Sequence, residues 1–98
     1  MKAKRLYYLK ETDIDGDLLE LVVWEVSITN EHPEGVRYRF AFIPTGSKVP
    51  RVLYDNHHPI GHHKHIGSRE YDYPFEDVDQ LLIDFRSDIA AWKKRRGD

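Results

Sequence analysis

Apolar and polar residues alternate along the first half of the chain in short runs that end at turn-forming residues. Such alternation places every second side chain on the same face of an extended segment and is typical of β-strands. It is clearest in the third run, where Tyr38, Phe40 and Phe42 share one face. The Asp15-Gly16 pair between the first two runs favours a tight hairpin. The pattern predicts strands at residues 6–12, 18–28, 36–43 and 51–54.

The second half of the chain changes from a strand-like to a helical periodicity. Residues 63–66 are predicted as a short fifth strand that ends before Gly67. From Phe75 onward, apolar residues recur every three or four positions, as on one face of an amphipathic helix. Acidic residues follow Pro74 in the first turn and basic residues fill the last turn, 93–96, an arrangement that the helix dipole favours. The predicted apolar stripe consists of Val78, Leu81, Leu82, Phe85, Ile89 and Trp92.

This order of elements predicts an α+β fold, an antiparallel meander sheet of four to five strands with one long C-terminal helix packed on one face. The length fits a single domain spanning residues 1–98. The strand at 18–28 is apolar on both faces, so we expect it to be central. We interpret its Leu19, Leu21 and Val23 face as an exposed surface for a homodimer or another protein, and assign Trp24 and Trp92 to the core.

Composition and charge narrow the class of protein. With 40% hydrophobic and 33% charged residues, the chain fits a soluble folded domain. The formal net charge of −2 excludes a global basic field that would attract nucleic acid. The absence of cysteine excludes disulfides and thiolate metal sites and fits a reducing compartment. No secretory signal or membrane-spanning run is visible, so we expect a cytoplasmic protein without membrane association.

The most unusual feature is a histidine-rich segment, residues 57–65, which holds five of the six histidines. Imidazole titrates near neutrality, so it serves as proton donor, proton acceptor and metal ligand. One interpretation is a metal site, in which His63 and His65 share a strand face and a third ligand comes from Asp55, His57 or His58. Against it, the run contains no second acidic residue, and we therefore predict no metal and no other cofactor.

The interpretation that we favour is metal-free acid–base cleavage of RNA. Attack by the 2′-hydroxyl needs a base, an acid for the leaving 5′-oxygen, and cations for the charge on phosphorus. Arg37 and Arg39 share a strand face, but we expect that face to be solvated. The predicted catalytic residues are His62, His63, His65 and Asp55, the last to orient a histidine. The predicted substrate contacts are Lys64, Arg69 and Arg51 for phosphate and Tyr54 for base stacking.

Two elements of the histidine segment resemble the TumE family of toxin–antitoxin toxins. These are Tyr54-Asp55-Asn56 and His62-His63-Lys64-His65, followed by Leu82-Ile83-Asp84-Phe85 in the helix. The resemblance covers roughly residues 50 to 90 as well as the strand-rich N-terminal half, whereas the pair His57-His58 departs from the family pattern. It implies a toxin neutralised by a cognate antitoxin, and many toxins of this size are metal-independent ribonucleases.

The combined prediction is a toxin component that acts as a metal-independent endoribonuclease through histidine acid–base chemistry. The expected partners are the antitoxin and RNA, with a homodimer as a candidate assembly. The alternative is a non-enzymatic module that binds metal or nucleic acid. A polar loop whose histidines only satisfy backbone groups is the interpretation without chemistry.

Overall fold

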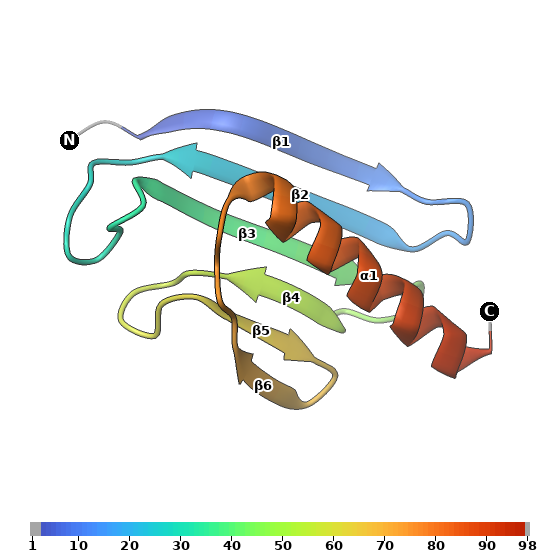
Figure 1. The fold of residues 1–98 in the computed structure, drawn as a ribbon. Helices are drawn as coiled ribbons and strands as arrows, with labels where there is room; N and C mark the ends of the chain where they lie inside the picture. The colour runs from blue at the N-terminus through green and yellow to red at the C-terminus, as the bar shows by residue number, and fades with distance from the viewer. Residues whose placement is uncertain (1–2, 98) are drawn as a thin grey trace.

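The computed structural model describes residues 3–97 and arranges them as one sheet and one helix. The sheet is an antiparallel meander in which the six strands pair in chain order (Figure 1). Its extra strand lies at the end of the predicted series, so the α+β prediction is confirmed with a slightly higher strand count. The elements are β1 (Lys4–Thr12), β2 (Leu18–Glu25), β3 (Val36–Ile43), β4 (Val52–Asp55), β5 (His63–Ile66), β6 (Arg69–Asp72) and α1 (Val78–Arg96).

Helix α1 lies across one face of the sheet, and the core is between them (Figure 1). The Phe40 and Phe85 rings meet edge to face with centroids 5.4 Å apart, and Phe42 meets Trp92 at 5.5 Å. All six residues of the predicted stripe either belong to the core or pack against it, so this prediction is confirmed. No helix within residues 3–97 is both long and apolar enough to cross a membrane.

Strand β2 corrects the predicted interface. Leu21 and Val23 are each 1% exposed because they pair with Phe40 and Tyr38 of β3 and lie beneath α1. The face interpreted as a partner surface is therefore core, and it offers no argument for a homodimer. Trp24 lies on the other face, half-buried and outside the core cluster, so its assignment to the core was also wrong.

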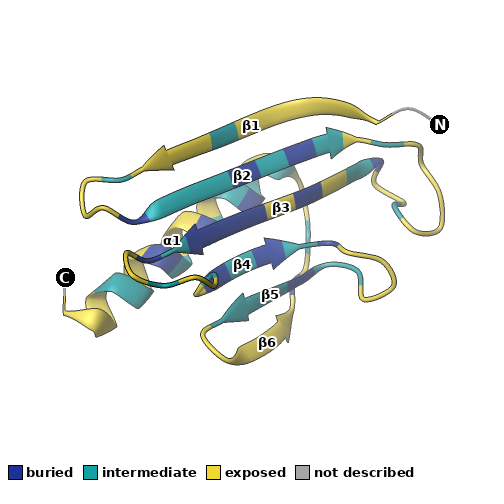
Figure 2. Ribbon diagram, turned by 180° about the vertical axis from the view of Figure 1, so that it is seen from behind, coloured by how far each residue is buried: buried dark blue, intermediate teal, exposed yellow. Residues whose placement is uncertain are grey.

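Within residues 3–97, no helix lies on the opposite face of the sheet (Figure 2). Buried and less buried residues intermix along β2 to β4, whereas the edge strands β1 and β6 are largely exposed (Figure 2). We call the uncovered side the open face. It is the surface on which polar side chains of the inner strands remain accessible.

Strand β6 was not predicted because all four of its residues are exposed and its pattern is polar throughout. It pairs with β5 through the two-residue turn Gly67-Ser68, in which Gly67 has a φ of 62°. Glycine adopts this left-handed conformation without the steric cost that other residues meet. A Gly-Ser pair between two short extended runs is itself a hairpin pattern, so the turn was visible in the sequence.

Helix α1 begins later than predicted and is fixed at both ends. Asp77 is the N-cap and accepts a hydrogen bond from the Gln80 backbone N–H at 2.8 Å, so Phe75 precedes the helix. At the other end, Lys93 Nζ contacts Asp13 at 2.7 Å and Asp15 at 2.6 Å in the β1–β2 turn. Buried Asp17 receives a hydrogen bond from Arg96 at 2.8 Å, which lowers the pKa of Asp17 to about 2. These contacts attach the last turn of α1 to the sheet.

Candidate active site

Strand alternation places His63 and His65 together on the open face. In the register of the sheet, His63 lies between Asp55 of β4 and Asp72 of β6, and His65 pairs with Glu70 of β6. Two imidazoles from one strand thus meet carboxylates from both neighbouring strands. Of the eight predicted site residues, this arrangement brings together His63, His65 and Asp55.

The His63 ring is held on both sides and its side chain is only 4% exposed. Its Nδ1–H donates a hydrogen bond to the Gly61 carbonyl at 2.7 Å. Its Nε2 lies 3.0 Å from Asp55 Oδ1. The Asp55 carboxylate therefore faces the second nitrogen of the ring and fixes its direction.

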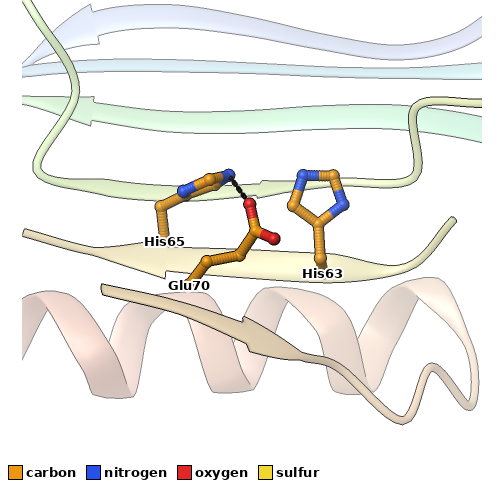
Figure 3. Close-up of side chains that lie close together, drawn as sticks. All are labelled: His63, His65 and Glu70. Atoms are coloured by element: carbon orange, nitrogen blue, oxygen red, sulfur yellow. Dashed lines mark ion pairs between the residues drawn. The ribbon is translucent and has the colours of Figure 1, made fainter. Parts of the chain in front are cut away.

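The His65 ring repeats this arrangement in a more accessible position, with 36% of its side chain exposed. Its Nε2 lies 3.2 Å from Glu70 Oε1. The two imidazoles meet edge to face with ring centroids 5.0 Å apart. Figure 3 shows the Glu70 carboxylate between the two rings, directed to His65. The donor atoms of His63, His65 and Glu70 all lie within 4.8 Å of one another.

A pocket of about 250 Å³ on the open face reaches Asp55, the carboxylate partner of His63, although neither His63 nor His65 lines it. Its lining includes Trp24, Arg37 and Arg39 together with Asp55 and His57. Arg39 makes only a long ion pair of 3.7 Å with Glu20 and keeps 45% of its side chain exposed. The arginines expected to be simply solvated therefore line a pocket with an aromatic ring, and Asp55 lies between Arg39 and His63 in the register of the sheet.

Lys64 and Tyr54 lie on the opposite face, under α1. Lys64 Nζ lies 3.0 Å from Asp88 Oδ2 and 3.5 Å from the Tyr54 hydroxyl, which itself donates to Asp88. Burial raises the pKa of Tyr54 far above its ordinary value, and its side chain is fully buried. It is therefore not available to stack on a base, and the sheet separates Lys64 from the two histidines.

The remaining predicted residues lie in three other places. His62 stacks on Phe75 with ring centroids 4.7 Å apart, and its Nε2 lies 2.9 Å from Glu34. Arg69 opens β6 and lines a groove beside Trp92 at the end of α1. Arg51 is exposed directly before β4, and its backbone N–H donates to the Phe42 carbonyl at 2.9 Å. Within residues 3–97, the side chains of these three residues make no hydrogen bond or ion pair with His63 or His65.

Glu70 is the residue of this site that the sequence analysis missed. It lies outside the histidine-rich segment and reaches His65 only through the β5–β6 register. The Gly67-Ser68 hairpin pattern could have revealed it, since a two-residue turn places residue 70 opposite residue 65.

Comparison with protein-family models gives a match to the family described as toxin TumE, over residues 3–93. The chain belongs to the TumE toxin family. The match extends well beyond the histidine-rich segment and includes every strand of the sheet. The predicted resemblance is confirmed, and membership implies a toxin with a cognate antitoxin. Neither the curated proteins nor the solved structures compared with this TumE family member gave a match.

Proposed function

We propose that this TumE family member is the toxin of a toxin–antitoxin pair and cleaves RNA without a metal ion, at the His63–His65 pair. The observation that supports the proposal is the pairing of two imidazoles, each with its Nε2 beside a carboxylate, on the open face. Such carboxylates hold the ring nitrogens in a defined direction. Acid–base cleavage of RNA requires one base and one acid, and two positioned imidazoles can supply both.

In the proposed reaction His65, the more exposed ring, accepts the proton of the RNA 2′-hydroxyl. The new 2′-O–P bond forms as the P–O5′ bond breaks. His63 gives a proton to the leaving 5′-oxygen once its ring turns outward from Asp55 and the Gly61 carbonyl, which hold both of its nitrogens in the free protein. The products are a 2′,3′-cyclic phosphate and a 5′-hydroxyl end, so the step needs no water and no external reactant.

The substrate contacts predicted for Lys64 and Tyr54 fall instead to the open-face pocket that Asp55 lines. Arg37 and Arg39 offer positive charge for the phosphate, and Trp24 offers a ring for a base. Guanidinium groups also stabilise the extra negative charge on phosphorus in the transition state. The open face therefore provides catalytic and binding groups on one accessible surface.

The direct experiment incubates tag-free protein with single-stranded RNA in the presence of a chelator and identifies the product ends. We expect 2′,3′-cyclic phosphate ends, and we expect His65→Ala to lower the cleavage rate by about 10²–10⁴-fold, the usual contribution of one acid–base group. His58→Ala is the matched control, since His58 is exposed in the loop before β5. Equal rates for the His65 variant and the wild type would contradict the proposal.

The pocket also favours a second candidate function, a non-enzymatic module that binds nucleic acid through Trp24, Arg37 and Arg39. This function predicts RNA binding that is unchanged in His65→Ala and no cleavage by the wild type. A binding measurement on the same RNA distinguishes the two functions, because only the enzyme couples binding to product ends.

A further inference from the structure

We propose that the converging ligand atoms of His63, His65 and Glu70, all within 4.8 Å, form a binding site for one divalent transition-metal ion of the zinc type. We further propose that the bound ion stops RNA cleavage, and this second part rests on the proposed function. The site combines a His-x-His pair on β5 with a carboxylate placed opposite it on β6. It differs from the predicted ligand sets, which drew the third ligand from Asp55, His57 or His58.

The geometry is close to that of an occupied site. Zinc–nitrogen and zinc–oxygen bonds of about 2.0–2.2 Å place tetrahedral ligands roughly 3.3–3.5 Å apart. His65 Nε2 and Glu70 Oε1 are already 3.2 Å apart. Both of these side chains are partly exposed, at 36% and 52%, so they can move toward His63 without disturbing the core.

His63 is prepared as a ligand by its surroundings. Its Nδ1–H is held by the Gly61 carbonyl at 2.7 Å, which leaves Nε2 as the coordinating atom. Metal-bound histidines characteristically donate the other ring N–H to a carbonyl or carboxylate in this way. Asp55, 3.0 Å from Nε2, is a further oxygen donor at the same position.

The donor types select the class of ion. Imidazole suits zinc, copper, nickel and iron, whereas calcium and magnesium prefer shells composed mainly of oxygen. Two imidazoles with one or two carboxylates match the zinc-type set, and the chain has no cysteine to offer a softer ligand. Magnesium at the same concentration should therefore leave the site empty.

The inhibitory effect follows from what the ion displaces. Coordination uses the Nε2 lone pairs of both rings, and these are the atoms that accept or release protons in the proposed cleavage. A chelator should reverse the effect.

The binding test titrates tag-free protein with Zn²⁺ alone, by calorimetry or against a chromophoric chelator. We expect one ion per chain, and at least about 10-fold weaker binding in His65→Ala and in Glu70→Gln, because each variant loses a ligand. The double variant His57→Ala/His58→Ala, which removes the exposed loop histidines, is the control and should bind as the wild type does. Unchanged affinity in the His65 and Glu70 variants, or loss of binding only in the loop variant, would overturn the site.

The activity test compares RNA cleavage with Zn²⁺ and with chelator for each variant, relative to its own metal-free rate. Zn²⁺ should inhibit the wild type, and Glu70→Gln should require at least about 10-fold more Zn²⁺ for the same inhibition. Stimulation by Zn²⁺ would overturn the inhibitory role. If no variant cleaves RNA under any condition, the proposed function fails, while the titration still decides whether the metal site exists.

Discussion

The two faces of the sheet at β4 and β5 carry similar chemical groups in opposite situations. On the covered face, Lys64 and the Tyr54 hydroxyl share Asp88 beneath α1. On the open face, His63 and His65 each meet a carboxylate, and one of these carboxylates, Asp55, lines a pocket. Consecutive residues of one short strand therefore supply a structural contact and a candidate reaction centre.

The difference teaches that proximity in sequence does not decide which charged groups act together. Asp88 is occupied by partners that belong to the folded chain, and burial of Tyr54 keeps its hydroxyl protonated. The side chains of Glu70 and His65 are 52% and 36% exposed, so an added ligand can reach them. The first arrangement stabilises the fold, and the second is available for chemistry.

The largest expected effect appears when a substitution on the open face is compared with a substitution of the adjacent residue, on the covered face. His65→Ala should reduce RNA cleavage by about 10²–10⁴-fold while changing the free energy of unfolding by less than about 0.5 kcal/mol. Lys64→Ala should do the reverse, with cleavage retained and stability lowered by about 1 kcal/mol, because Asp88 loses its cation. Cleavage rates and urea unfolding of both variants test the comparison, and a loss of activity in the Lys64 variant alone would invert it.

The acidic β1–β2 turn, which contacts the last turn of α1, extends the comparison to another buried carboxylate, that of Asp17. The pKa of Asp17 is lowered to about 2 by the Arg96 hydrogen bond, from an ordinary value of 3.8. A lowered folded-state pKa adds stability above pH 3.8 that is lost as the pH falls toward 2, here about 2 kcal/mol. Unfolding measured between pH 5 and pH 2 should show this loss in the wild type. Asp17→Asn should show a smaller dependence on pH, and an identical dependence would disprove the assignment.

A smaller effect is expected for the hydroxyl beneath the helix. Tyr54→Phe keeps the buried ring but leaves Asp88 without one hydrogen bond, which should cost about 1–2 kcal/mol of unfolding free energy. Tyr71→Phe is the matched control, since Tyr71 is 42% exposed on β6, two strands from Tyr54. Chemical denaturation of both variants checks the result. A cost as large in the Tyr71 variant would show that the hydrogen bond from Tyr54 to Asp88 does not account for the loss.

The smallest effect concerns the arginines of the open face. Arg39→Ala should raise the KM for RNA a few-fold and lower the slope of its salt dependence by about one, as expected for a single phosphate contact. Arg86→Ala, on the exposed side of α1, should change neither quantity. Steady-state cleavage at several salt concentrations measures both, and equal effects of the two variants would remove Arg39 from the site.

Much of the fold was predictable because its signals are local. The bounds of β3 and β5 were predicted to the residue. The predicted stripe of α1 identified every apolar residue of the helix that belongs to the core or packs against it. Strand β6 was missed because an edge strand with only exposed residues lacks hydrophobic alternation. The candidate site followed the same division, since His63 and His65 lie on a predicted strand and Asp55 directly follows one, while Glu70 lies on β6.

The sequence by itself determined which residues share a face. The two-residue period of a strand separates His63 and His65 from Lys64 in any fold that extends this segment. Only the tertiary structure decided which face is open. Strand β2 is apolar on both sides, so its pattern did not reveal that α1 covers Leu21 and Val23. Covering a face depends on packing between distant segments, and the pairing that brings Glu70 to His65 depends on strand register; neither is visible in local periodicity.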